Sequence, residues 1–139
     1  MNRFLVLGLL FTFSTFSSLA GPEKMIGTWK WNKGATVAHL KIHTRLTKAQ
    51  IEKISSVLEK QVLVIDTETI SLTLGDEKYT SNYKVLSETG NKITFEAQDP
   101  QTKKPMKVTY EFDASGKGFW VALDKIEGFK ERWDKVPAN

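Results

Sequence analysis

Apolar and polar residues alternate along most of the chain after residue 60, which is typical of β-strands that bury one face. In one such run, Val108 and Tyr110 alternate with Lys107 and Thr109. Turn-forming residues separate these runs at intervals of about eight to twelve residues. The pattern predicts about eight strands, over residues 25–31, 62–66, 70–74, 79–85, 93–97, 106–112, 119–123 and 129–136. Their succession favours a mostly β, antiparallel up-and-down fold, as a barrel or a sandwich.

A helical pattern interrupts the strands between the first and the second. Ile51, Ile54 and Leu58 recur at helical spacing, and Thr47 with Gln50 three residues later forms a capping box. We therefore predict a helix over residues 48–60. Residues 35–43 fit a strand or a helix, because their apolar residues both alternate and share one helical face. The insertion thus contains one helix or two.

The first twenty residues have the features of a secretory signal peptide. Arg3 supplies the positive end, residues 4–13 are almost entirely apolar, and Ser18 and Ala20 are the small residues that a signal peptidase needs. The apolar part is about ten residues, too short to span a bilayer as a helix. We expect cleavage between Ala20 and Gly21, and a secreted or periplasmic product that consists of one domain, residues 21–139, without a membrane anchor.

Composition narrows the possible partners. The chain has no cysteine, so no disulfide and no lipid on a cysteine is expected. Its 20 Lys and Arg against 16 Asp and Glu give a net charge of +4, and these charges are scattered singly, which does not favour nucleic acid. Lys103, Lys104 and Lys107 form the densest basic patch, beside the turn-like sequence DPQTKKP. We interpret this patch as a solvated hairpin loop in preference to a phosphate or membrane contact.

Signals for catalysis or metal binding are weak. The sequence has no G-x-S-x-G elbow, glycine-rich phosphate loop or catalytic cysteine, so we expect neither an enzyme nor a cofactor. His39 and His43 are the only histidines. On a helix both imidazoles would share one face within reach of a metal ion, whereas on a strand they would lie about 13 Å apart. Two ligands alone make a poor site, so a solvated pair is the favoured interpretation and no metal is expected.

Glu131 is an acid that alternation directs toward the interior, between Phe129 and Trp133. If buried, it needs a partner such as tyrosine or arginine and would have a raised pKa. Such a position more often marks a bulge or an open barrel end, which is the favoured interpretation here.

Gly27 and Trp29 form a G-x-W motif in the first predicted strand. With the helical insertion and the meander of strands, the chain resembles the calycin group, which includes lipocalins, fatty-acid-binding proteins and small bacterial lipocalin-like domains. The resemblance implies that Trp29 plugs one end of a barrel and that a basic residue of the last strand, Arg132 or else Lys130, covers its ring. It also favours a second helix over residues 35–43. We therefore predict a mostly β fold, an up-and-down antiparallel barrel of about eight strands that is lipocalin-like, with a one- or two-helix insertion between its first and second strands.

The resemblance has limits that concern the ligand. About eight short strands replace the ten of fatty-acid-binding proteins, and their arginine and tyrosine pattern for a carboxylate cannot be located. Ligand identity therefore does not carry over.

Aromatic residues dominate the predicted interior. Alternation points eight rings inward, those of Trp29, Tyr79, Tyr83, Phe95, Tyr110, Phe112, Phe119 and Trp133. An eight-stranded barrel is either filled by its side chains or holds one small ligand. The rings therefore form a packed core or line a site, and the candidate ligand residues are Tyr79, Tyr83, Tyr110, Phe119 and Trp31.

These observations are compatible with two functions. The first is a non-enzymatic binding protein for a small apolar or amphipathic ligand, held beneath the helix over residues 48–60. The alternative is a filled barrel that acts through its outside, as an envelope interaction module or a secreted inhibitor of another protein. The alternative predicts an exposed apolar patch, at Trp31 or at Trp120.

Overall fold

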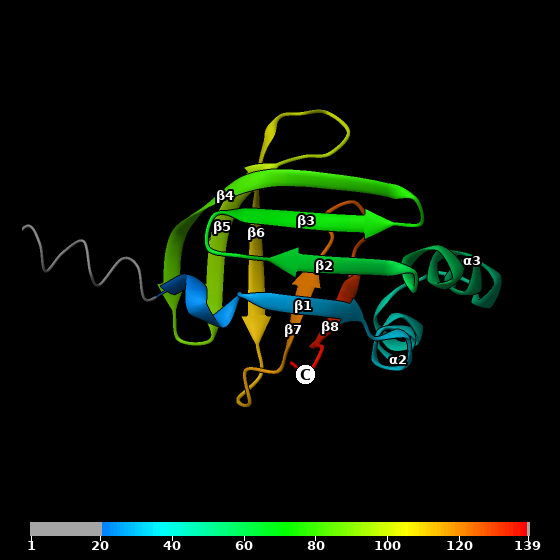
Figure 1. Cartoon of the computed structure of the whole chain (residues 1–139). Coiled ribbons are helices and arrows are strands. Elements are labelled where there is room, and N and C mark those ends of the chain that lie inside the picture. The colour runs from blue at the N-terminus through cyan, green and yellow to red at the C-terminus, as the bar shows by residue number, and fades with distance from the viewer. Residues whose placement is uncertain (1–20, 139) are drawn as a thin grey trace, which may run out of the picture.

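The computed structural model describes residues 21–138, so the predicted signal peptide lies outside the described residues. Eight strands form a closed barrel in which every neighbouring pair is antiparallel and the spatial order follows the chain (Figure 1). The strands are β1 (Gly27–Trp31), β2 (Gln61–Ile65), β3 (Thr69–Leu74), β4 (Glu77–Thr89), β5 (Lys92–Gln98), β6 (Pro105–Phe112), β7 (Gly118–Ala122) and β8 (Lys130–Lys135). The predicted mostly β fold is confirmed, and its form is the barrel and not the sandwich.

Strand pairing is continuous around the barrel but uneven. β1 pairs with β2 on one side and with β8 on the other, where Trp31 lies opposite Trp133, and this closes the ring. The ladder between β6 and β7 consists of Glu111 opposite Trp120 and Phe112 opposite Phe119. Residues 105–110 of β6 therefore pair with β5 but have no partner in β7.

Two helices lie between β1 and β2 at one end of the barrel, as Figure 1 shows. They are α2 (Lys33–His43) and α3 (Lys48–Leu58), so residues 35–43 are helical. The capping box of Thr47 and Gln50 is present as predicted, and α3 ends slightly before its predicted end. A 3-10 helix, η1 (Gly21–Lys24), precedes β1. No helix within residues 21–138 is long and apolar enough to cross a membrane.

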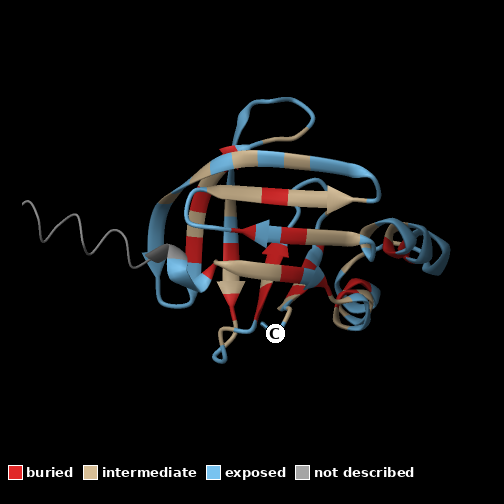
Figure 2. Ribbon diagram, in the orientation of Figure 1, coloured by how far each residue is buried: buried red, intermediate tan, exposed pale blue. Residues whose placement is uncertain are grey.

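The barrel core consists largely of aromatic rings. Buried residues follow the inward faces of the strands (Figure 2). Trp29, Phe95 and Phe119 are the largest of the fully buried side chains. A second, smaller core of Leu40, Ile51 and Phe129 holds the helices together and attaches them to the barrel.

Gly128 brings the backbone of the β7–β8 loop close to the end of α2. Gly128 in this loop has a φ of 78°, and a Cβ there would overlap with the carbonyl oxygen of His43. On the helix, His39 Nε2 lies 3.0 Å from the Gly128 carbonyl oxygen. The insertion is therefore held by close backbone contact as well as by its apolar core.

Candidate functional site

Glu131 lies inside the barrel, where alternation directs it, and not at a bulge or an open end. It is buried, and its Oε2 accepts a hydrogen bond of 3.1 Å from Trp31 Nε1. Burial raises the pKa of Glu131, while hydrogen bonds from the indoles of Trp133 and Trp31 act in the opposite direction. The sequence suggested a tyrosine or an arginine as the partner of Glu131, but its partner in the structure is the indole of Trp31.

Tyr110 is the tyrosine whose pKa is affected by the charge of Glu131. Burial raises the pKa of its hydroxyl, and the charge of Glu131 adds to the effect. Its ring stacks on Phe119, with centroids 3.9 Å apart, and meets Phe95 edge-on at 4.8 Å. Tyr110 is therefore a neutral ring, tightly packed among the core aromatics, whose pKa is also raised by the charge of Glu131.

The five candidate ligand residues do not form one site. Trp31, Tyr110 and Phe119 belong to the buried core. Tyr83 is half-buried, and its hydroxyl donates to the Asp66 carbonyl at 2.7 Å. Tyr79 is also only half-buried, and its hydroxyl donates to Glu77. Tyr83 thus lies at the margin of the core, where it meets Phe95 edge-on, whereas Tyr79 is not part of the core.

One of two hollows in the described part of the protein is lined by a candidate ligand residue. The larger, about 380 Å³, lies where β4 and β5 meet the β5–β6 loop, and Tyr83, Ala97 and Lys103 are among its lining residues. The smaller, about 160 Å³, lies between α2 and α3. Of the five candidate residues, Tyr83 alone lines either hollow, and Glu131 lines neither.

Trp29, the predicted barrel plug, belongs to the buried core. It is fully buried, and its Nε1 donates to the Met25 carbonyl at 2.9 Å. The cation over its ring is Lys135, whose Nζ lies 5.7 Å from the ring centroid. A Cβ at Gly27, where φ is 144°, would come within 2.8 Å of the Lys135 side chain. The G-x-W glycine therefore leaves room for the cation.

The prediction that Arg132 covers Trp29 is wrong, and so is its alternative, Lys130. Both residues alternate with the inward-facing Glu131 and Trp133 on β8, so their side chains leave the barrel. Arg132 instead lies over the outward ring of Trp120, 5.9 Å from its centroid. Lys135 follows Trp133 by two residues and shares its face, a relation that sequence analysis missed.

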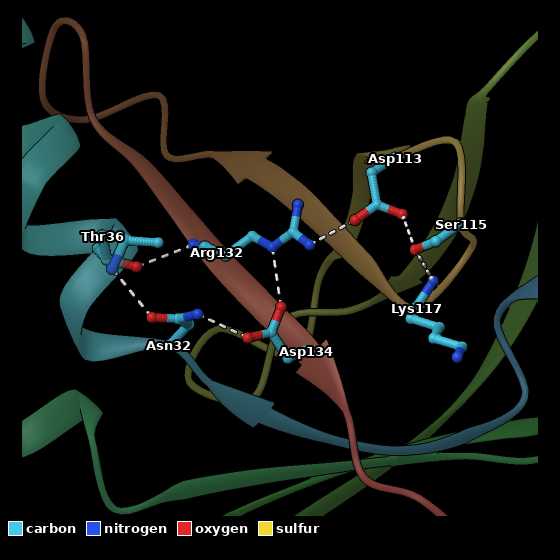
Figure 3. Close-up of polar contacts among 8 residues, drawn as sticks. Asn32, Thr36, Asp113, Ser115, Lys117, Arg132 and Asp134 are labelled. Carbon is cyan, nitrogen blue, oxygen red and sulfur yellow. Dashed lines mark hydrogen bonds and ion pairs between the residues drawn. The ribbon is translucent and has the colours of Figure 1, made fainter.

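Arg132 is the centre of a polar network on the outside of the barrel (Figure 3). Its guanidinium donates to Asp134 at 2.9 Å and to Asp113, in the β6–β7 turn, at 2.5 Å. Asp134 also accepts from the Asn32 amide at 2.6 Å, and Asn32 caps the start of α2. Thr36 of α2 accepts from the Arg132 backbone at 2.9 Å. The network therefore ties α2 to β8 and to the β6–β7 turn.

Arg132→Met should lower the free energy of unfolding by about 1–2 kcal/mol, because it removes two charge-assisted hydrogen bonds in a partly exposed setting. Urea denaturation measures the change. Lys130→Met is the matched control, since Lys130 lies on the same face of β8 and forms no ion pair within residues 21–138. Equal stability of the two variants would contradict a structural role for the network.

The two histidines lie side by side on α2, as a helix predicts. Their rings stack with centroids 4.3 Å apart. Burial lowers the pKa of His39, and the charges of His43 and Lys130 lower it further. Within residues 21–138, no group of three metal-ligating side chains is found. His43 is exposed, whereas His39 is half-buried beside Trp120 and the Gly128 carbonyl, so His39 is not a solvated residue. That the pair binds no metal stays a prediction.

The exposed tryptophan that the second function requires is not Trp31, which is buried. Trp120 faces outward and is half-buried between Arg132 and the His39 ring, whose centroid is 5.3 Å away. Its outward direction agrees with the alternation of β7.

Glu131→Gln should be more stable than the native protein at pH 7. With a raised pKa, the folded state binds more protons than the unfolded state, so the contribution of Glu131 to stability is greatest below its ordinary value of 4.5 and falls as the pH rises through the raised pKa. Glutamine keeps an acceptor for Trp31 without the charge. The advantage should therefore shrink at about pH 4.

Urea denaturation of Glu131→Gln and the native protein at both pH values measures this difference. Glu96→Gln, on the outer face of β5, is the control. A Glu131→Gln advantage that does not change with pH would show that the fold does not raise the pKa of Glu131.

No family model, no curated protein and no solved structure matches this chain. The architecture of the barrel is therefore the basis for comparing this protein with known classes. A closed eight-stranded antiparallel barrel with a helical insertion after its first strand fits a lipocalin-like architecture.

Proposed function

We propose that the protein is a lipocalin-like, non-catalytic binding protein whose barrel is filled by its own side chains and whose partner contacts its outside. The contacts among the interior rings carry this proposal. Tyr110 stacks on Phe119, and Trp29 meets Phe119 edge-on with centroids 4.9 Å apart. Three of the residues considered as ligand contacts are thus engaged with core neighbours.

The energetic cost of making room supports the same proposal. Aromatic pairs contribute about 0.5–1.5 kcal/mol beyond the burial of their surface. A ligand between Tyr110 and Phe119 would have to separate their rings, and one beside Trp31 would have to compensate for its hydrogen bond to Glu131. A non-catalytic role is supported by the surroundings of Glu131, which faces indoles and lines neither described hollow.

A titration with a dansylated fatty acid tests the filled barrel. We expect no stoichiometric quenching of tryptophan fluorescence and no change in near-ultraviolet circular dichroism, because the rings keep their packing. One-to-one binding with both signals altered would contradict the proposal. Native mass spectrometry of protein purified without denaturation should show the apo mass alone.

We also propose export, so that this surface acts outside the cytoplasm. The composition of residues 1–20 supports this part. When the full chain is expressed in a bacterium, N-terminal sequencing should find Gly21 as the first residue. Retention of Met1 would contradict export.

A carrier of a small amphipathic molecule is the second candidate, and the hollow beside Tyr83 favours it. A volume of about 380 Å³ falls within the usual range for small-molecule sites. If the fatty acid binds there, Tyr83→Ala should weaken its binding whereas Tyr79→Ala should not, because Tyr79 does not line the hollow. Equal effects of the two substitutions would exclude this site.

A further inference from the structure

The helical insertion, residues 33–60, concentrates the positive charge of the protein. It holds six of the chain's 20 Lys and Arg residues but only two of its 16 Asp and Glu residues. These residues are Lys33, Lys41, Arg45, Lys48, Lys53 and Lys60, with Glu52 and Glu59. The net charge of the insertion, +4, equals that of the whole chain, so the remaining sequence is balanced. The positive charge is therefore concentrated in the insertion. This corrects the expectation that the charges are scattered singly along the chain.

These cations are available to a partner. All six basic side chains of the insertion are exposed. Lys33 pairs with Glu59 at 3.0 Å, and within residues 21–138 the other five form no ion pair. Lys33, Lys41 and Lys48 also line the hollow between α2 and α3, together with apolar Val37 and Ile51.

Exposed apolar side chains accompany the cations. Ile42 is 76% exposed and Val57 is 49% exposed, the two highest values among the exposed large hydrophobic residues. Each follows a buried helical residue, Leu40 or Ser55, by two positions, which is about 200° around a helix. Ile42 and Val57 therefore project away from the side of each helix that packs on the protein. Much of the α3 ribbon is coloured as exposed in Figure 2.

The fold presents this surface in a fixed position. Leu40 and Ile51 pack against Phe129, and the polar network of Asn32 and Thr36 fixes the start of α2 on β8. The helices are thus ordered before any partner binds, and no folding step has to accompany binding.

We infer that the helical insertion docks on the surface of an anionic phospholipid bilayer. Lys41, next to Ile42, and Lys53, one helical turn before Val57, would lie at the headgroup phosphates. Ile42 and Val57 would enter the interface between headgroups and acyl chains. An acidic soluble protein would match the cations, but a bilayer surface matches the exposed apolar side chains as well. The inference rests on the proposed function, because it names the partner of the outer surface.

Vesicle flotation of the chain from residue 21 to 139 tests this docking. We expect binding to vesicles of equal parts phosphatidylcholine and phosphatidylglycerol, none to phosphatidylcholine alone, and weaker binding as salt rises. The double variant Lys41→Glu/Lys53→Glu should bind the anionic vesicles about tenfold or more weakly. Ile42→Ser should weaken binding about threefold, because it removes apolar surface from the interface.

The second basic patch supplies a matched control. Lys103→Glu/Lys104→Glu makes the same change in net charge on the exposed β5–β6 loop and should leave binding within about twofold. All substituted side chains are exposed, and unchanged urea denaturation would show that each variant keeps its fold.

Three results would overturn the inference. They are equal binding to both vesicle types, equal losses in the helix and loop variants, and capture by polyglutamate in solution without capture by vesicles, which would indicate an acidic protein partner. Absence of binding to both vesicle types is a case of the first result and also overturns the inference. It does not decide whether the barrel is filled, which the fatty acid titration tests separately. Stoichiometric uptake of that probe would contradict the filled barrel without changing the vesicle result.

Discussion

Trp29→Ala should lower the free energy of unfolding by about 3–5 kcal/mol, the range for removing a large buried ring. The indole is fully buried and meets Phe119 and Phe112 edge-on, with centroids 4.9 and 6.0 Å away. Its removal would also leave the Met25 carbonyl without its donor and Lys135 without the ring beneath it. A cavity, a lost hydrogen bond and a lost cation–π contact together explain the size of the effect.

Urea denaturation, followed by far-ultraviolet circular dichroism, measures this loss. Trp120→Ala is the control, because its ring is half-buried on the outer face of β7 and should contribute about 1 kcal/mol. If Trp29→Ala lost no more stability than Trp120→Ala, Trp29 would not be a structural plug.

Gly128→Ala should destabilise the protein by about 2–3 kcal/mol, through backbone strain and a clash together. A side chain at φ 78° is strained, and its Cβ would overlap with the His43 carbonyl oxygen. To relieve that overlap, the β7–β8 loop has to move away from the end of α2. We therefore expect faster amide exchange in α2 as well as a lower unfolding midpoint.

Gly116→Ala separates the two causes. Gly116 has a similar φ of 70°, but no atom lies within 4 Å of the position of its Cβ. Its substitution should cost about 1 kcal/mol from strain alone and leave α2 exchange unchanged. Equal losses in both variants would show that the contact between Gly128 and His43 adds nothing.

The elements could be predicted from local sequence because each type of element repeats its apolar residues at its own spacing. A strand that buries one face repeats them every two positions, and a helix repeats them every three to four. Alternation located the inward positions of Trp29, Phe95 and Glu131, and the capping box located the start of α3. Residues 35–43 stayed ambiguous because their pattern satisfied both periods. Only their packing against β8 and the β7–β8 loop decides for a helix.

Contacts between distant segments could not be predicted in the same way. Alternation gives the face of a residue but not which cation reaches a ring, so Arg132 was expected where Lys135 lies. The network of Asn32, Arg132 and Asp113 joins elements up to about a hundred residues apart, and no local pattern records it. The concentration of positive charge could have been predicted from the sequence, since counting the charged residues within the predicted insertion is enough to find it.

The incomplete ladder between β6 and β7 also bears on solubility. An open strand edge invites pairing with the edge of another copy, which is a route to aggregation. This edge begins with Pro105, which has no N–H to offer, and it carries the exposed Lys107. Two residues that look like ordinary loop and surface positions thus protect the barrel from pairing with other copies at the point where its own sheet is least complete.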